Sequence, residues 1–111
     1  MRDDRERLVD MLEAIGKIER YSMRSRDDFN KDEMLQVWIV RHLQVIGEAA
    51  SRVTGETRER FPEIPWNKMI GMRHVLAHGY FDIDLDIVWS VLINDLEPLK
   101  QNVQLALQTL A

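Results

Sequence analysis

The chain has 111 residues, of which 45% are hydrophobic and 31% are charged, and its formal net charge is −4. A chain of this length buries roughly two-thirds of its unfolded surface but is too short for two cores, so we expect one domain over residues 1–111. No apolar run approaches the roughly 20 residues needed to cross a bilayer, residues 1–7 lack the apolar stretch of a signal peptide, and there is no cysteine. We therefore expect a cytoplasmic protein without a membrane partner. The negative net charge excludes a surface that attracts nucleic acid indiscriminately, and we expect no DNA partner.

The first half of the chain predicts two amphipathic helices. The first spans residues 3–24. The second spans residues 30–54, with Asn30 as its N-cap and Glu33 completing a capping box. Apolar residues of the second helix fall into two stripes, one of Leu35, Ile39, Ile46, Ala50 and Val53 and one of Met34, Trp38, Val45 and Ala49. Because a helix that is apolar on two sides packs on more than one neighbour, we expect the second neighbour to be another subunit.

The second half predicts a loop and two further helices. Residues 55–66 contain one glycine and two prolines and are typical of a loop. Asn67 can cap a short third helix. The alternating aspartates of residues 82–86 suit the N-terminus of a last helix over residues 85–110, in preference to a metal site, and Pro98 should kink or split that helix. These elements predict an all-α fold, an antiparallel bundle of four to five helices.

The third helix carries the residues with the clearest chemistry. At about 100° per residue, Met69, Met72, Val75 and Leu76 share one arc, while Ile70, Arg73, His74, Ala77 and His78 share the opposite arc. Arginine forks onto phosphate oxygens, and histidine can accept and return a proton near neutral pH. This pattern favours cleavage of a phosphodiester without a metal. The alternative is that Arg73, His74 and His78 merely cap the last turn of the helix, with Gly79 ending it.

Other sequence fragments that accompany this motif separate the two interpretations. The pattern Arg73-x4-His78-x-Tyr80 resembles the signature of the HEPN superfamily, and more narrowly that of HepT-like toxins from prokaryotic toxin–antitoxin pairs. The resemblance covers nearly the whole chain, through fragments that occur in order: residues 7–8 with 12–15 in the first helix, then 46–49, 62–66, 71–73, 78–81 and 88–89. One departure is His74, where relatives often carry asparagine. The resemblance implies a HEPN-like helical fold, a homodimer with a composite site at its interface, and ribonuclease activity that needs neither metal nor cofactor.

Within this resemblance, Arg73 is expected to clamp the phosphate and His78 to act as general base or acid. His74 is a possible supporting residue. Since His74 and His78 are four residues apart they could form half of a metal site, but no third ligand is evident nearby. Glu48 either pairs with Arg73 across the bundle or is simply exposed. Basic residues that could hold RNA occur at Arg20, Arg24 and Arg26 and again at Arg52, Arg58, Arg60 and Lys68.

Tyr80 has a structural interpretation and a regulatory one. It could pack beside Phe81 at the end of the helix. The resemblance implies instead that an MntA-like minimal nucleotidyltransferase, the cognate antitoxin, transfers AMP from ATP onto this tyrosine and thereby blocks the site. A function from another class remains open, in which the chain is a non-catalytic module that binds a nucleotide or docks a nucleotidyltransferase. On an ideal helix Arg73 and His78 point about 140° apart, which is wide for one compact site and favours a dimer in which two copies combine.

Overall fold

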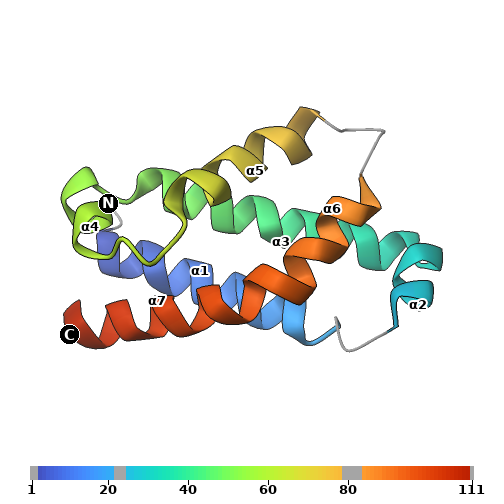
Figure 1. Ribbon diagram of the computed structural model, residues 1–111, viewed down its shortest axis with the longest axis horizontal. Helices are drawn as coiled ribbons and strands as arrows, with labels where there is room; N and C mark the ends of the chain where they lie inside the picture. Colours follow the sequence, from blue (N-terminus) through green and yellow to red (C-terminus); the bar gives the residue numbers. More distant parts are fainter. Residues whose placement is uncertain (1–2, 22–24, 79–83, 111) are drawn as a thin grey trace.

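The described residues of the computed structural model, 3–21, 25–78 and 84–110, form helices joined by turns and contain no strand (Figure 1). For residues 73–78 the description covers the backbone and not the side chains. The helices, in chain order, are α1 (Asp4–Glu19), α2 (Arg26–Lys31), α3 (Glu33–Arg52), α4 (Gly55–Arg60), α5 (Trp66–His78), α6 (Leu85–Ser90), the π-helical segment η1 (Val91–Asp95) and α7 (Leu96–Leu110). The predicted all-α bundle is confirmed.

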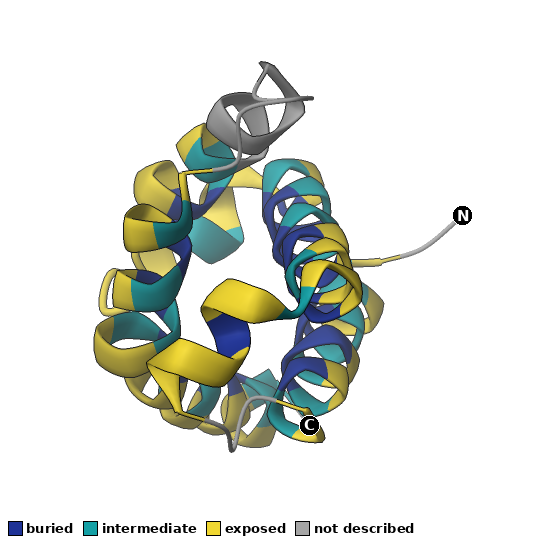
Figure 2. Ribbon diagram, turned by 90° about the vertical axis from the view of Figure 1, so that its right-hand side faces the viewer, coloured by how far each residue is buried: buried dark blue, intermediate teal, exposed yellow. Residues whose placement is uncertain are grey.

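Helix α3 lies at the centre of the packing, with α1 along one flank and α5 along the other, and α1 also packs against α7. Viewed from the side, the buried faces of the helices point inward around a common core (Figure 2). The first apolar stripe predicted for this helix is buried throughout, and its members are Leu35, Ile39, Ile46, Ala50 and Val53. Full burial of one such leucine or isoleucine side chain contributes roughly 1.5–3 kcal/mol. This stripe therefore fixes which side of α3 faces the core.

The predicted second helix is in fact two helices, and its predicted cap is wrong. Residues 26–31 form α2, so Asn30 lies inside that short helix instead of preceding α3. Asp32 ends α2 and caps α3, because its carboxylate accepts a hydrogen bond from the Leu35 amide at 3.0 Å. The Gln36 side chain donates to the Phe29 carbonyl at 2.9 Å and so fixes the bend between the two helices. The first helix is also shorter than predicted and ends at Glu19.

The predicted loop over residues 55–66 contains a helix, α4, that begins after Thr54. The Thr54 hydroxyl accepts a hydrogen bond from the Thr57 amide and caps this turn. Asp4, fifty residues earlier, supports the same cap by accepting hydrogen bonds from the Thr54 amide at 3.1 Å and the Thr54 hydroxyl at 2.6 Å. The helix depends on a carboxylate from α1, which explains why local composition alone predicts a loop.

Helix α5 begins one residue before the predicted cap Asn67. The Met69 amide donates to the Pro65 carbonyl at 3.1 Å, so the first turn already includes Trp66. The indole of Trp66 is buried, and its Nε1 donates to the Phe61 carbonyl at 3.0 Å. Burial of this ring and its hydrogen bond set the start of α5, and Asn67 lies exposed within the first turn.

The predicted last helix is interrupted close to Pro98, as expected. Proline has no amide hydrogen and cannot donate to a carbonyl one turn earlier. The interruption takes the form of the π-helical turn η1, in which the Leu96 amide reaches back to the Val91 carbonyl. Such single π-turns locally widen an α-helix. Pro98 then lies in the first turn of α7, where the missing donor matters least.

Candidate functional site

Helix α5 carries Arg73, His74 and His78 in its last turns and presents them from one continuous backbone. The directions of these three side chains lie outside the described atoms, as does Tyr80 altogether. At the start of α5 the side chain of Met69 is buried, while Ile70 and Met72 are partly buried against the core. Burial of Met69 confirms the core arc at that position, whereas Ile70 is closer to the core than its place on the opposite arc predicts.

Two contacts attach α5 to the rest of the bundle. Along one side it packs against α3. On another side the Lys68 ammonium lies 2.8 Å from the Asp95 carboxylate in η1, above a small apolar cavity that Met69, Leu43 and Leu99 help to line. The positions of Arg73 and His78 therefore depend on the packing between α3, α5 and the π-turn.

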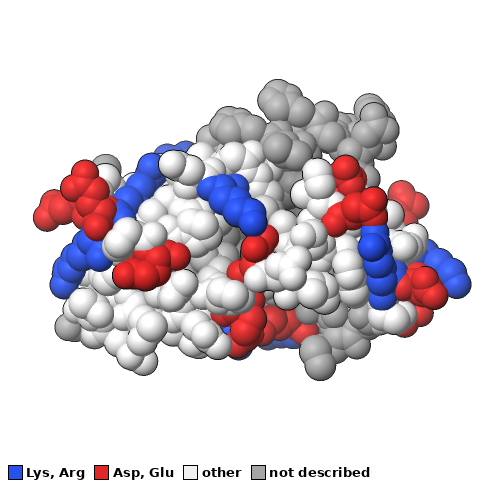
Figure 3. All heavy atoms as spheres, in the orientation of Figure 1, with Lys and Arg blue, Asp and Glu red and all other residues white. Residues whose placement is uncertain are grey.

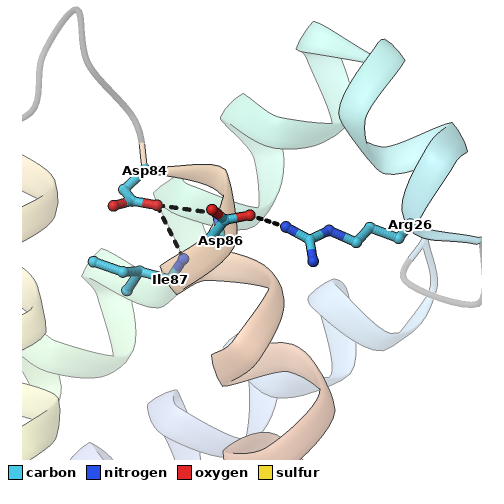
Figure 4. A network of polar contacts seen from close by, with 4 residues as sticks. All are labelled: Arg26, Asp84, Asp86 and Ile87. Atoms are coloured by element: carbon cyan, nitrogen blue, oxygen red, sulfur yellow. Dashed lines mark hydrogen bonds and ion pairs between the residues drawn. The ribbon is translucent and has the colours of Figure 1, made fainter.

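The next described helix after α5 is α6. Asp84 caps this helix by accepting hydrogen bonds from the Asp86 and Ile87 amides at 3.0 and 3.2 Å (Figure 4). This capping confirms the prediction for Asp84, while residues 82 and 83 lie outside the described part. The Arg26 guanidinium pairs with the Asp86 carboxylate, and the Phe29 ring lies 5.5 Å from the Trp89 ring. Helix α2 thus secures the start of α6.

Glu48 lies on α3 and is half-buried. Its carboxylate accepts from the Arg52 guanidinium at 3.0 Å, one helical turn further on. Arg73 is the predicted partner of Glu48, and its side chain lies outside the described atoms. Glu48 also lines a groove between α1 and α3 with a volume of about 670 Å³. This groove places Glu48 on the outer side of α3, away from the buried stripe.

Sequence analysis missed His42, the buried polar side chain of this groove. The His42 ring lies 4.4 Å from the Trp38 ring and is 9% exposed. Burial lowers the pKa of His42, and the nearby charges of Lys17 and Arg41 lower it further. A histidine one turn after a tryptophan on an apolar helix was the available signal, but which helix covers it depends on the fold.

Several of the basic residues considered for RNA binding have partners inside the fold. Arg58 donates to the Ala50 and Ser51 carbonyls at the end of α3, Lys68 pairs with Asp95, and Arg52 pairs with Glu48. On the face drawn in Figure 3, basic and acidic side chains lie close to one another, and the described residues form no continuous basic band there. These cations have partners within the fold, and a role in holding RNA stays a prediction.

The described side chains include no group of three or more histidine, cysteine, aspartate or glutamate residues placed to hold a metal ion. The side chains of His74 and His78 are not among those described. None of the described helices combines the length and the apolar character that a membrane span requires.

Comparison with known proteins adds independent support. Residues 11–106 match the family described as Ribonuclease HepT-like. A candidate RNase of Methanocaldococcus jannaschii is 31% identical over 105 residues, covering 94% of this chain and 96% of the relative. A candidate ribonuclease HepT of Thermococcus cleftensis is 35% identical over 100 residues, covering 89% and 91% of the two chains. A candidate RNase of Caldanaerobacter subterraneus is 37% identical over 91 residues, covering 82% and 81%. No solved structure matches the chain. The protein therefore belongs to the HepT-like ribonuclease family.

Proposed function

We propose that this protein is the cytoplasmic toxin of a prokaryotic toxin–antitoxin pair, a metal-independent endoribonuclease whose site is built around Arg73 and His78. The observation that carries the proposal is the match to the HepT-like ribonuclease family across the motif, together with the position of both residues on the single helix α5. Because α5 packs against α3, the backbone positions of Arg73 and His78 are fixed relative to each other. Cleavage at phosphorus requires reacting groups in fixed relative positions.

The proposed reaction is an internal transfer within the RNA. His78 removes the proton from a ribose 2′-hydroxyl, and the 2′-oxygen forms a bond to the adjacent phosphorus. Arg73 stabilises the negative charge that develops on the non-bridging oxygens. The bond from phosphorus to the 5′-oxygen breaks as a protonated imidazole, from His74 or from the His78 of a second copy, supplies a proton to that oxygen. The products are a 2′,3′-cyclic phosphate and a 5′-hydroxyl.

Cleavage of RNA by the purified protein in excess chelator tests this reaction. We expect the wild type to cleave and both Arg73→Ala and His78→Ala to lose activity. Arg5→Ala is the matched control, because Arg5 is an exposed cation at the start of α1 and should be dispensable. Equal cleavage by wild type and both motif variants would refute the assignment of Arg73 and His78. A wild type that binds nucleotides without cleaving RNA would favour a non-catalytic docking module.

Control of the toxin is proposed to act at Tyr80, two residues beyond His78. An MntA-like nucleotidyltransferase would transfer AMP from ATP to the phenol oxygen, with release of pyrophosphate. The added phosphate places negative charge beside Arg73 and His78 and would repel RNA by the electrostatics that govern phosphorylation. The position of Tyr80 in the Arg73-x4-His78-x-Tyr80 motif, two residues after the last residue of α5 in the sequence, supports this proposal.

Mass spectrometry after incubation with the cognate transferase, ATP and magnesium tests the modification. We expect a gain of one or more AMP units that Tyr80→Phe abolishes. Tyr21→Phe is the matched control, because Tyr21 is the other of the two tyrosines in the chain and is 44% exposed. Loss of the modification in Tyr21→Phe, or its persistence in Tyr80→Phe, would refute the assignment. Tyr80→Phe should keep ribonuclease activity and escape the antitoxin.

A further inference from the structure

A groove of about 670 Å³ runs between α1 and α3, and the proposed reaction does not use it. Sites for small organic ligands commonly enclose about 300–1,000 Å³. The apolar side chains that line this groove are small, namely Ala14 of α1 with Val45 and Ala49 of α3. Ala14 and Ala49 are buried, so they form part of its floor. Small side chains on both helices leave room for a flat ring, and the groove therefore has the size and the lining of a nucleoside site.

The antiparallel course of α1 and α3 brings four polar side chains to one end of this groove. The Nε1 of Trp38 on α3 donates to the Lys17 carbonyl on α1 at 3.0 Å, whereas the start of α1 bonds to the residues beyond the end of α3. One turn back from Lys17 to Glu13 is therefore level with one turn forward from Trp38 to Arg41 and His42. These last four lining residues, Glu13, Lys17, Arg41 and His42, are called the polar end of the groove.

The polar end offers hydrogen-bonding groups of both kinds. In the described part of the chain, no hydrogen bond or ion pair engages the Arg41 guanidinium or the Glu13 carboxylate, and both residues are exposed. His42 is nine-tenths buried, and its Nε2 has no hydrogen-bond partner among the described residues. A buried polar nitrogen without a partner destabilises a fold. A ligand with donors and acceptors on its edges would give all three side chains a partner.

Guanine is the RNA base whose edges match this set of side chains. Its O6 and N7 are adjacent acceptors, and an arginine that forks onto this pair is the commonest specific contact to a base. Its N1–H and N2 amino group are adjacent donors, which suit the two oxygens of one carboxylate. Adenine, cytosine and uracil each lack at least one of these two pairs.

The balance of charge in the groove argues against a site for the phosphate backbone. A strand of RNA bound through its phosphates requires an excess of cations along its path. Three cations and three carboxylates line the groove, namely Arg7, Lys17 and Arg41 with Asp10, Glu13 and Glu48. An uncharged ligand with polar edges, such as a base, is the better match.

We propose that the polar end of the groove binds guanine, with Arg41 bonded to O6 and N7 and Glu13 bonded to N1–H and the N2 amino group. The face of the ring lies over Ala14 and Val45. A free guanine nucleotide and an unpaired guanosine in RNA carry this same group, since single-stranded RNA can present its bases splayed out. For RNA, the inference rests on the ribonuclease proposed above and gives it a preference for substrates with an unpaired guanosine.

Titration of the ¹⁵N-labelled protein with guanosine tests the site, because this nucleoside lacks the phosphate that Arg73 would hold. We expect NMR shifts of backbone amides around Glu13 on α1 and around Arg41 on α3. Guanosine should bind at least about tenfold more tightly than adenosine, cytidine or uridine. Inosine, which lacks the N2 amino group, should bind more weakly than guanosine.

Arg41→Gln and Glu13→Gln should each weaken guanosine binding at least about tenfold, with unchanged helical circular dichroism. Arg5→Gln and Glu33→Gln are the matched controls, because both residues are exposed on the same two helices and lie outside the groove. They should bind guanosine as the wild type does. Equal affinity for the four nucleosides, shifts centred elsewhere, or undiminished binding by both groove variants would overturn the site.

The outcomes separate this inference from the proposed reaction. Arg73→Ala should still bind guanosine. Guanosine binding that depends on Arg41 and Glu13, in a preparation that leaves RNA intact, would support the groove and refute the reaction. Cleavage of RNA by a protein that does not bind guanosine would overturn the groove and leave the reaction standing.

An oligoribonucleotide with one unpaired guanosine distinguishes the two sources of guanine. If the groove holds RNA, replacing that guanosine by inosine should slow cleavage by the wild type, and Glu13→Gln should cleave both strands at the same rate. If cleavage by the wild type is equal for the two strands while guanosine still binds, the groove serves a free guanine nucleotide.

Discussion

Truncation of Met69 should uncouple the motif helix from the bundle. Met69 is 5% exposed and lies where α5 contacts α3, beside the small apolar cavity near η1. Replacing a buried methionine by alanine costs about 2–5 kcal/mol of unfolding free energy. A chain of this size has about 5–15 kcal/mol in total, so Met69→Ala should fold at low temperature. The packing contacts that this substitution removes belong to α5, the helix that carries Arg73 and His78.

Met11→Ala provides a control of the same chemistry. Met11 is fully buried on α1, which packs against α3 and α7, so its truncation should cost a similar amount of stability. Misplacement of a reacting group by about 1 Å can cost up to about 100-fold in rate. We therefore expect Met69→Ala to lose at least about tenfold in ribonuclease activity, while Met11→Ala keeps nearly all of it.

The assay is RNA cleavage at a temperature where circular dichroism shows both variants fully folded, with urea unfolding to compare their stabilities. Comparable stability losses with a selective loss of activity in Met69→Ala would support the positioning role of the α3–α5 contact. Equal activity in the two variants at matched stability would refute it, since α5 would then hold its last turns without this contact.

Two further predictions concern pH. Burial tends to raise the pKa of Asp4, but hydrogen bonds from Thr54 and Thr57 and the charge of Arg58 outweigh it, so the pKa is lowered in the fold. The ionised Asp4 carboxylate therefore stabilises the fold above the usual pKa of 3.8, and this contribution is lost as the pH falls from that value through the lower pKa of the folded state. Asp4→Asn should lower the unfolding free energy by about 1–3 kcal/mol at neutral pH and flatten this acid dependence in urea titrations, and an unchanged acid profile would contradict the network. The pKa of His42 is also lowered, so as the pH falls the unfolded chain takes up the imidazole proton before the folded chain does, and the free energy of unfolding should fall below about pH 6.5. His42→Gln should remove this pH dependence of the unfolding free energy between neutral and mildly acidic pH. A pH dependence that persists in the variant would rule out His42 as its source.

Much of the helical framework follows from the sequence because the relevant signals are local. The spacing of Leu35, Ile39 and Ile46 defines one face of α3 whatever surrounds it, and all three are buried as predicted. The cap at Asp84 is equally local, since its carboxylate contacts amides two and three residues ahead. The grouping of Arg73, His74 and His78 on one helix also needs only the helical period.

Contacts between residues distant in the chain decided the remainder. Helix α4 forms where composition predicts a loop because Asp4 reaches its cap from α1, and α3 begins at Glu33 because α2 occupies the preceding residues. The groove that encloses His42 exists only once α1 lies beside α3, so no pattern within α3 predicts that its nitrogen is buried without a partner. The sequence by itself determined the buried face of α3 and the grouping of the motif residues on one helix, since both depend on neighbours within a turn or two. The tertiary structure decided which surfaces are covered, since burial is the sum of contacts between elements.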